Sequence, residues 1–236
     1  MDIDIGDFLI INYTTKVKET NKVIETTSKE VATKEHIFRE GINYEPRLLI
    51  IGEEELKHLQ EELLKLDMEL NKVFTIELPP EKAYGVRIPN NVKILRLKQL
   101  LRRGIKPVVG MKLTYNEHEV VVRSVNSGRV MIDFNSPLAG KTIIYEVTIL
   151  KKLESLNDKV LALIHRKTSV IEEDKWKLSI KNKVLTIEIP EESLYIEGFS
   201  ITKKNIVMDI EKYTDITDVN YIERYKCKKK EDKKNE

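Results

Sequence analysis

The stretch Leu78-Pro79-Pro80-Glu81-Lys82-Ala83-Tyr84-Gly85 is the most informative part of this 236-residue sequence. It includes the end of a segment, residues 73–78, that predicts a β-strand. Two consecutive prolines remove two backbone N–H donors, so the strand has to end before them. The five residues that follow predict a compact turn that closes on a glycine. The pattern therefore indicates a sheet strand that leads directly into a loop.

Further elements are predicted on both sides of this stretch. Leucines at positions 56, 59, 63 and 66 recur at spacings of three and four, which predicts a helix over residues 53–68 with one apolar stripe on a sheet. Asn126-Ser127-Gly128 predicts a hairpin turn, because glycine adopts positive φ angles without strain. Residues 86–134 carry strands of their own and predict an inserted domain. Strands are predicted at residues 8–13, 22–27, 48–51, 120–125, 129–134 and 142–150.

The pattern of elements restarts after residue 153. Helices are predicted at residues 158–165 and near 201–213, and strands at 176–180, 184–189 and 219–225. These elements predict a separate α+β domain over residues 154–225. The last residues, 226–236, form a charge run without apolar anchors and predict a disordered tail.

The overall charge balance argues against several classes of protein. The chain has 41 Lys and Arg against 39 Asp and Glu, a net charge of +2, so no one-signed field is expected and nucleic acid is not an expected partner. No apolar run approaches the roughly 20 residues of a membrane span, so no membrane is expected. The lone Cys227 cannot form an internal disulfide, which fits a reducing compartment and predicts a cytoplasmic protein.

Four stretches of the sequence follow one another in order: Gly6-Asp7 with Asn12-Tyr13-Thr14, Ile24-Glu25-Thr26-Thr27, residues 78–85, and Phe134-Asn135 with Leu138-Ala139-Gly140 before Tyr145. In this order they resemble the FKBP-type peptidyl-prolyl isomerases, in particular the SlyD-like and long archaeal forms with a domain inserted in the flap. The resemblance covers residues 1 to about 153 and implies a half-open antiparallel sheet around one short helix, an α+β fold. It implies an FKBP-like domain at 1–85 and 135–153 with the insert at 86–134, and residues 154–225 resemble the extra C-terminal domain of the long archaeal forms.

The implied reaction needs neither a nucleophile nor a proton transfer. A prolyl bond isomerises slowly because its C–N bond has partial double-bond character, with a barrier of roughly 18–20 kcal/mol. An apolar slot that holds the proline ring and favours the twisted amide is sufficient. By position, the resemblance implies that Tyr84 donates its hydroxyl to the substrate carbonyl. The site residues that it implies are Tyr13, Ile24, Glu25, Leu56, Tyr84, Leu138 and Tyr145.

The segment Leu56-Lys57-His58-Leu59-Gln60 departs from the family pattern, which has Pro-Gly before a large apolar pocket floor. Without Pro-Gly the helix is expected to begin earlier, and Lys57 or Gln60 to occupy space that the proline ring needs. Glu25 stands where the family has an aspartate, and Arg47 where an apolar residue is common. These departures predict weak isomerase activity or none.

Three hypotheses follow. The first is a peptidyl-prolyl isomerase with chaperone activity toward unfolded or proline-containing polypeptides, which the resemblance extends to a homodimer through the C-terminal domain. The second is a catalytically weak or inactive chaperone or binding module of the same fold. The third is RNA binding through the basic stretch 93–106. No cofactor is expected, and no metal either, because the four histidines lie far apart with no ligand spacing.

Overall fold

The computed structural model describes residues 2–225 of the chain. This part forms two compact units, one made of residues up to 13, 26–73 and 147 onward, the other of residues 14–25 and 74–146. Helices combined with antiparallel strand pairs confirm the predicted α+β fold class. No helix within residues 2–225 is long and apolar enough to span a membrane. The tail predicted at 226–236, which includes Cys227, lies outside the described residues.

The first sheet has the strand order β2-β1-β9-β4, with β3 paired antiparallel to β1. Side chains alternate between buried and half-buried positions along β1 and most of β9, as expected for strands with one face on a core. The strands are β1 (Phe8–Val17), β2 (Lys22–Thr26), β3 (Arg47–Ile50), β4 (Val73–Leu78) and β9 (Ile143–Leu153).

The helix expected over residues 53–68 is shorter than predicted. It is α2 (Lys57–Leu63), because Leu56 has φ 54° and ψ 29°, a left-handed conformation that cannot continue a right-handed helix. Leu59 and Leu63 are fully buried, whereas Leu66 is 43% exposed, so only the middle of the leucine stripe faces a core. A second short helix, α1 (Lys29–Lys34), begins at Ser28, whose side chain accepts a hydrogen bond from the Val31 N–H.

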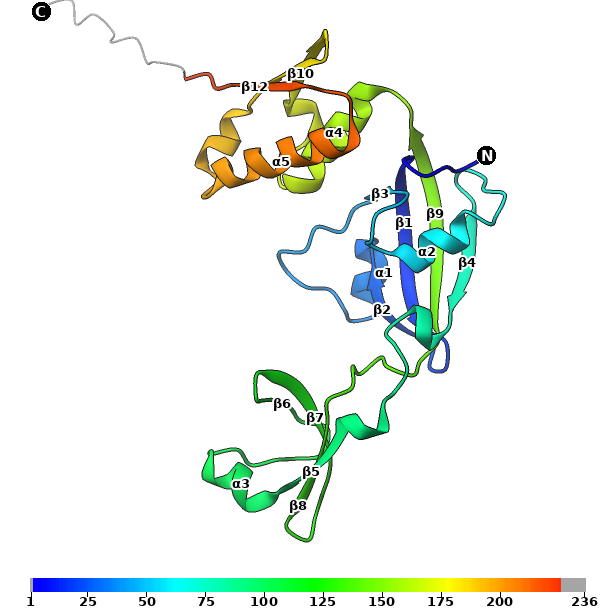
Figure 1. Cartoon of the computed structure of the whole chain (residues 1–236), viewed down its shortest axis with the longest axis vertical. Helices are drawn as coiled ribbons and strands as arrows, with labels where there is room; N and C mark the ends of the chain where they lie inside the picture. The colour runs from blue at the N-terminus through cyan, green and yellow to red at the C-terminus, as the bar shows by residue number, and fades with distance from the viewer. Residues whose placement is uncertain (1, 226–236) are drawn as a thin grey trace, which may run out of the picture. The chain divides into compact units, whose positions relative to one another are not determined.

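Residues 92–133 form a second sheet with the order β5-β8-β7-β6, all of whose neighbours are antiparallel (Figure 1). The predicted hairpin is confirmed: Ser127 and Gly128 join its strands with φ angles of 46° and 74°, as in a type I′ turn. A separate core of buried residues holds the sheet to α3: Leu100, Leu113, Val120, Val122, Val130 and Ile132. The elements are β5 (Val92–Arg96), α3 (Leu97–Arg102), β6 (Lys112–Tyr115), β7 (His118–Asn126) and β8 (Arg129–Asp133), with a 3-10 turn η2 (Pro89–Asn91) before them.

The C-terminal elements form a three-stranded sheet, β10-β11-β12, and two helices that lie side by side (Figure 1). The pair β10–β11 is antiparallel, and β11–β12 is parallel. Their core includes the single tryptophan, Trp176, and also takes in Phe8 and Ile50 from the first sheet. The elements are α4 (Leu156–Lys167), β10 (Lys177–Lys181), β11 (Val184–Glu188), α5 (Phe199–Tyr213) and β12 (Asp218–Ile222), with 3-10 turns η3 (Glu173–Lys175) and η4 (Glu191–Tyr195).

Candidate active site

Three of the predicted site residues, Glu25, Tyr84 and Tyr145, interact electrostatically within one unit. Tyr145 comes from β9 and is 8% exposed, Tyr84 follows the 3-10 turn η1 (Pro80–Lys82) and is 42% exposed, and Glu25 is an exposed residue of β2. Burial, followed by the nearby Tyr84 and Glu25, raises the pKa of Tyr145 to about 12. Burial and then Glu25 also raise the pKa of Tyr84. Both phenols therefore keep their protons at neutral pH.

Two further predicted site residues belong to the same unit. Ile24 is half-buried beside Glu25 on β2, and Leu138 is half-buried in the segment between β8 and β9. That segment is tied to the turn after β4, because the Gly140 N–H donates to the Gly85 carbonyl at 2.8 Å. The Ala-Tyr-Gly and Leu-Ala-Gly stretches, which are more than 50 residues apart in sequence, are therefore adjacent.

A group of polar bonds lies where residues 86–91 and 133–135 meet, and we call it the neck. Asn135 spans the Ile88 backbone, accepting from its N–H at 2.9 Å and donating to its carbonyl at 3.0 Å. Asp133 is fully buried and accepts from the Asn135 side chain at 2.8 Å, from Arg123 at 2.9 Å and from Arg87. Burial opposes ionisation of Asp133, but these hydrogen bonds outweigh it and lower the pKa of its carboxyl. The neck therefore holds a buried carboxylate between two guanidinium groups.

Tyr13 belongs to the other unit and is held by the Thr-Thr motif of the sequence. Its N–H donates to the Thr27 hydroxyl at 3.0 Å, and the Thr27 N–H donates back to the Tyr13 carbonyl at 3.0 Å. The ring is 3% exposed, and its hydroxyl accepts from Arg47 at 2.8 Å. Arg47 also pairs with Glu55 at 2.8 Å. Arg47, which stands where the family commonly has an apolar residue, is therefore held by the Tyr13 hydroxyl and the Glu55 carboxylate.

The loop before α2 is organised by Gln60, which is 3% exposed. Its side-chain oxygen accepts from the Gly52 N–H at 2.7 Å, and its amide donates to the carbonyls of Glu53 at 3.1 Å and Glu55 at 2.6 Å. Because these bonds take up both ends of the side chain, Gln60 holds the loop in place, and the expectation that it occupies space needed by the proline ring stays a prediction. Leu56, one of the predicted site residues, is half-buried at the end of this loop.

The expectation of an earlier helix start is wrong, and the expectation about Lys57 stays a prediction. Lys57 extends to Glu54 at 3.3 Å, and its side chain is about half exposed. The missing Pro-Gly does not lengthen the helix, because the left-handed Leu56 and the bonds of Gln60 shape the preceding residues as a loop. Sequence reasoning missed this role of Gln60. A glutamine on the buried stripe of an amphipathic helix was the available signal, since a buried amide needs partners.

Two histidines are engaged by single carboxylates. His165 lies 3.0 Å from Glu45, and His58 lies 3.1 Å from Glu61. Over residues 2–225, no cluster of three or more His, Cys, Asp or Glu side chains is arranged to hold a metal ion.

Comparison with known families matches two separate parts of the chain. Residues 93–138 match the model described as FKBP26, IF domain, and residues 156–226 match the model described as FKBP26 C-terminal. A short-type peptidyl-prolyl cis-trans isomerase of Methanocaldococcus jannaschii is 30% identical over 144 residues, which cover 61% of this chain and 90% of that protein. The chain belongs to the FKBP-type peptidyl-prolyl cis-trans isomerases.

Bacterial members of the FKBP family match over shorter ranges. The FKBP-type 16 kDa isomerase of Escherichia coli is 28% identical over 115 residues, or 46% of this chain and 75% of that protein. The SlyD isomerase of Treponema pallidum is 26% identical over 108 residues, or 44% of this chain and 61% of that protein. The resemblance inferred from the sequence is therefore confirmed, including the insert in the flap, and the chain is an enzyme of the isomerase class.

Proposed function

We propose that the FKBP-type domain catalyses cis–trans isomerisation of prolyl bonds at Ile24, Tyr84, Leu138 and Tyr145. The observation that carries this proposal is the pair of protonated tyrosines, one buried and one partly exposed, in the same unit as Ile24 and Leu138. A neutral phenol donates to an amide carbonyl without the desolvation cost of a charged donor. The roles of Tyr13, Leu56 and Glu25 in substrate contact remain predictions from the family resemblance.

Two tyrosine variants test this site. Tyr84→Phe removes only the partly exposed hydroxyl and is expected to lower kcat/KM on a short proline peptide by about fivefold, since a net hydrogen bond contributes about 1 kcal/mol. Tyr145→Phe is the matched variant for the buried hydroxyl. Unchanged activity in both variants, with native circular dichroism, would show that other residues carry the reaction.

The same protein is proposed to bind unfolded polypeptides through its insert. Exposed apolar side chains that the insert core leaves uncovered support this: Ile94 at 60%, Leu101 at 48%, Val108 at 66%, Val109 at 62% and Met111 at 38%. Replacing Val108 and Val109 by serine should weaken suppression of client aggregation without changing turnover of a short peptide. An inactive chaperone would show suppression without turnover.

Three predictions from the sequence remain proposals. They are the domain boundaries, the cytoplasmic location and the homodimer through the C-terminal domain. The dimer is supported by β12, which pairs with β11 on one side and forms an edge of the sheet as described, with Ile222 39% exposed. Sedimentation of the full chain against a variant with Ile222→Lys tests it.

A further inference from the structure

Charge is segregated strongly along this nearly neutral chain. Residues 86–134 contain ten Lys and Arg but only three Asp and Glu, a net charge of +7, so the rest of the chain carries −5 of the total of +2. Three of the ten basic residues have carboxylate partners: Arg87 and Arg123 on Asp133, and Lys112 on Glu119. The other seven are exposed and form no ion pair within residues 2–225: Lys93, Arg96, Lys98, Arg102, Arg103, Lys106 and Arg129.

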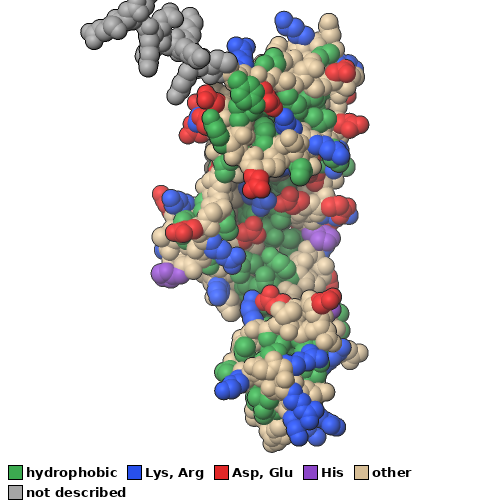
Figure 2. Space-filling view, turned by 90° about the vertical axis from the view of Figure 1, so that its left-hand side faces the viewer, with side chains coloured by type: hydrophobic (Ala, Val, Ile, Leu, Met, Phe, Trp, Pro, Cys, Tyr) green, Lys and Arg blue, Asp and Glu red, His purple; other side chains and the backbone are tan. Residues whose placement is uncertain are grey.

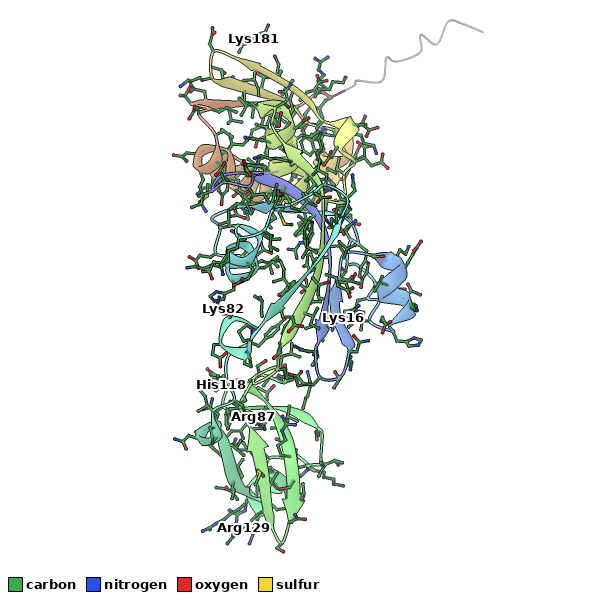
Figure 3. All side chains as sticks on the ribbon, turned by 90° about the vertical axis from the view of Figure 1, so that its right-hand side faces the viewer. Lys16, Lys82, Arg87, His118, Arg129 and Lys181 are labelled. Carbon is green, nitrogen blue, oxygen red and sulfur yellow. The ribbon has the colours of Figure 1, made fainter. Side chains whose placement is uncertain are left out.

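The strand register concentrates part of this charge. Arg96 lies directly opposite Arg129 in the antiparallel β5–β8 pair. Like charges placed directly across a pair destabilise a sheet, so this arrangement does not serve the stability of the insert. Lys98 and Arg102 follow on α3. Figure 3 shows Arg129 near the β7–β8 turn, and Figure 2 shows Lys and Arg side chains gathered over the insert.

Apolar side chains lie among these charges on the same face of the sheet. Ile94 is 60% exposed, sits two residues before Arg96 and faces Met131 across β5–β8. Because side chains alternate along a strand, Ile94, Arg96, Met131 and Arg129 share the face opposite the insert core. We call these four residues the mixed face.

A polypeptide suits the mixed face better than a nucleic acid does. Phosphate backbones would satisfy the guanidinium groups but would leave Ile94 and the exposed Leu101 without apolar partners. The aromatic rings of the insert that bases would stack on are already engaged, since Lys93 lies 5.0 Å from the Phe134 ring and Arg103 lies 5.2 Å from the Tyr115 ring. A segment with alternating acidic and aliphatic side chains would satisfy both components.

We propose that the basic insert, through its mixed face, selects unfolded polypeptide segments that combine aliphatic with acidic residues. This inference rests on the proposed chaperone function and names its client class. The basic side chains of the insert are exposed, so salt screens their attraction to acidic side chains of a client. Acidic segments are therefore favoured at low salt, and the preference weakens as rising salt shortens the Debye length.

The test uses the full chain and three labelled 20-residue peptides of equal Leu and Val content, with four variable positions that are all Glu, all Gln or all Lys. The expected result at about 20 mM salt is binding of the Glu peptide about tenfold tighter than the Gln peptide, and of the Lys peptide more weakly still. At about 500 mM salt the difference should fall below about twofold.

A charge-matched pair of variants tests whether the insert carries the preference for acidic peptides. Arg96, Arg102, Arg103 and Arg129 are changed to Gln in one variant, and the exposed Lys34, Lys181, Lys183 and Lys204 are changed to Gln in the control. Both lose four charges, but only the first should lose the preference for Glu, with its affinity for the Gln peptide kept. Equal loss in both variants would overturn the assignment to the insert.

The other possible results distinguish the charge preference from the proposed chaperone function. Binding of the Gln and Glu peptides within twofold of each other rejects the charge preference and leaves the chaperone function standing. No binding of any peptide rejects the chaperone function and the inference with it, while prolyl turnover is judged separately. Tighter binding of a duplex RNA of the same charge than of the Glu peptide would reassign the surface to nucleic acid.

Discussion

The C-terminal domain and the insert are joined to the rest of the chain in different ways. The C-terminal helices and strands bury their side chains in one core together with Phe8 and Ile50 of the first sheet. The insert closes a core made of its own residues, and polar bonds of the neck hold its two chain ends. A shared apolar core couples the unfolding of its parts, whereas a separate core joined by hydrogen bonds can open alone.

The ionic contacts follow the same division. In the unit with the shared core, Arg166 of α4 donates to Glu53 at 2.9 Å and to Asp209 of α5 at 2.8 Å, and Tyr213 also donates to Glu53. Burial opposes the charge on Arg166, but these partners outweigh it and raise its pKa. Since the Glu53 carbonyl accepts from Gln60, this network reaches the loop that ends at Leu56. The C-terminal domain therefore contributes to the order of a predicted part of the site.

The largest effect is expected from Phe8→Ala, which removes a ring that is 2% exposed in the shared core. It should lower the free energy of unfolding by about 3–5 kcal/mol. Because the core is shared, urea curves followed by Trp176 fluorescence and by circular dichroism of the sheets should shift together. A shift in the dichroism signal alone would show that the two parts unfold independently.

Ile132→Ala is the counterpart in the insert, at a fully buried position of its separate core. A local loss of about 2–4 kcal/mol is expected, seen as faster hydrogen exchange in β5, β7 and β8. The Trp176 transition should stay within about 0.5 kcal/mol of wild type. A Trp176 transition that follows the mutation would mean that the insert is coupled to the shared core.

Arg166→Met tests the ionic part of the C-terminal joint. Glu53 and Asp209 are 13% and 17% exposed at the side chain, so loss of their partner should cost about 2 kcal/mol, less than for a fully buried pair. Lys65→Met, which breaks an exposed pair with Glu62, should cost less than about 0.5 kcal/mol. In the double variant with Glu53→Gln, part of the loss should be recovered; strict additivity would contradict the coupling.

Acid should loosen the neck before it affects the shared core. The pKa of Asp133 is lowered in the folded chain, so its contribution is complete above the unfolded value of about 3.9 and is lost as pH falls through the lower folded value. Hydrogen exchange at Ile88 and Asn135 should therefore accelerate below about pH 4. In Asp133→Asn, destabilised by about 1–3 kcal/mol, that acid dependence should disappear. Its persistence would assign the effect to another carboxyl.

The smallest effect is expected from Gly140→Ala. Gly140 has φ +76°, and an added Cβ would lie 3.3 Å from the Arg87 Cβ. The left-handed backbone should cost an alanine about 1 kcal/mol, measured as a shift in the unfolding of the second unit. The control Gly104→Ala, at φ +75° with open space around it, isolates the backbone cost from the contact with Arg87.

Sequence reasoning recovered much of the fold because local chemistry dictated it. The strand over residues 73–78 agrees with the structure, since the two prolines after it cannot continue a ladder, and the Asn-Ser-Gly turn agrees because its φ angles are positive. The family pattern also named Tyr84 and Tyr145, which interact electrostatically in the structure, while their role in the site stays a prediction. The sequence was sufficient to predict those elements whose backbone conformation is set by the residue types within them.

Other features depended on contacts between distant residues. The helical spacing of the leucines did not reveal that Leu56 is left-handed, because the bonds of Gln60 to residues 52, 53 and 55 decide that loop. The basic stretch 93–106 was visible in the sequence, but only the strand register placed Arg96 opposite Arg129. The inclusion of Phe8 and Ile50 in the C-terminal core likewise required the tertiary structure. An apolar residue in the sequence indicates that its side chain is buried, but it does not indicate which other element buries it, because the hydrophobic effect is not directional.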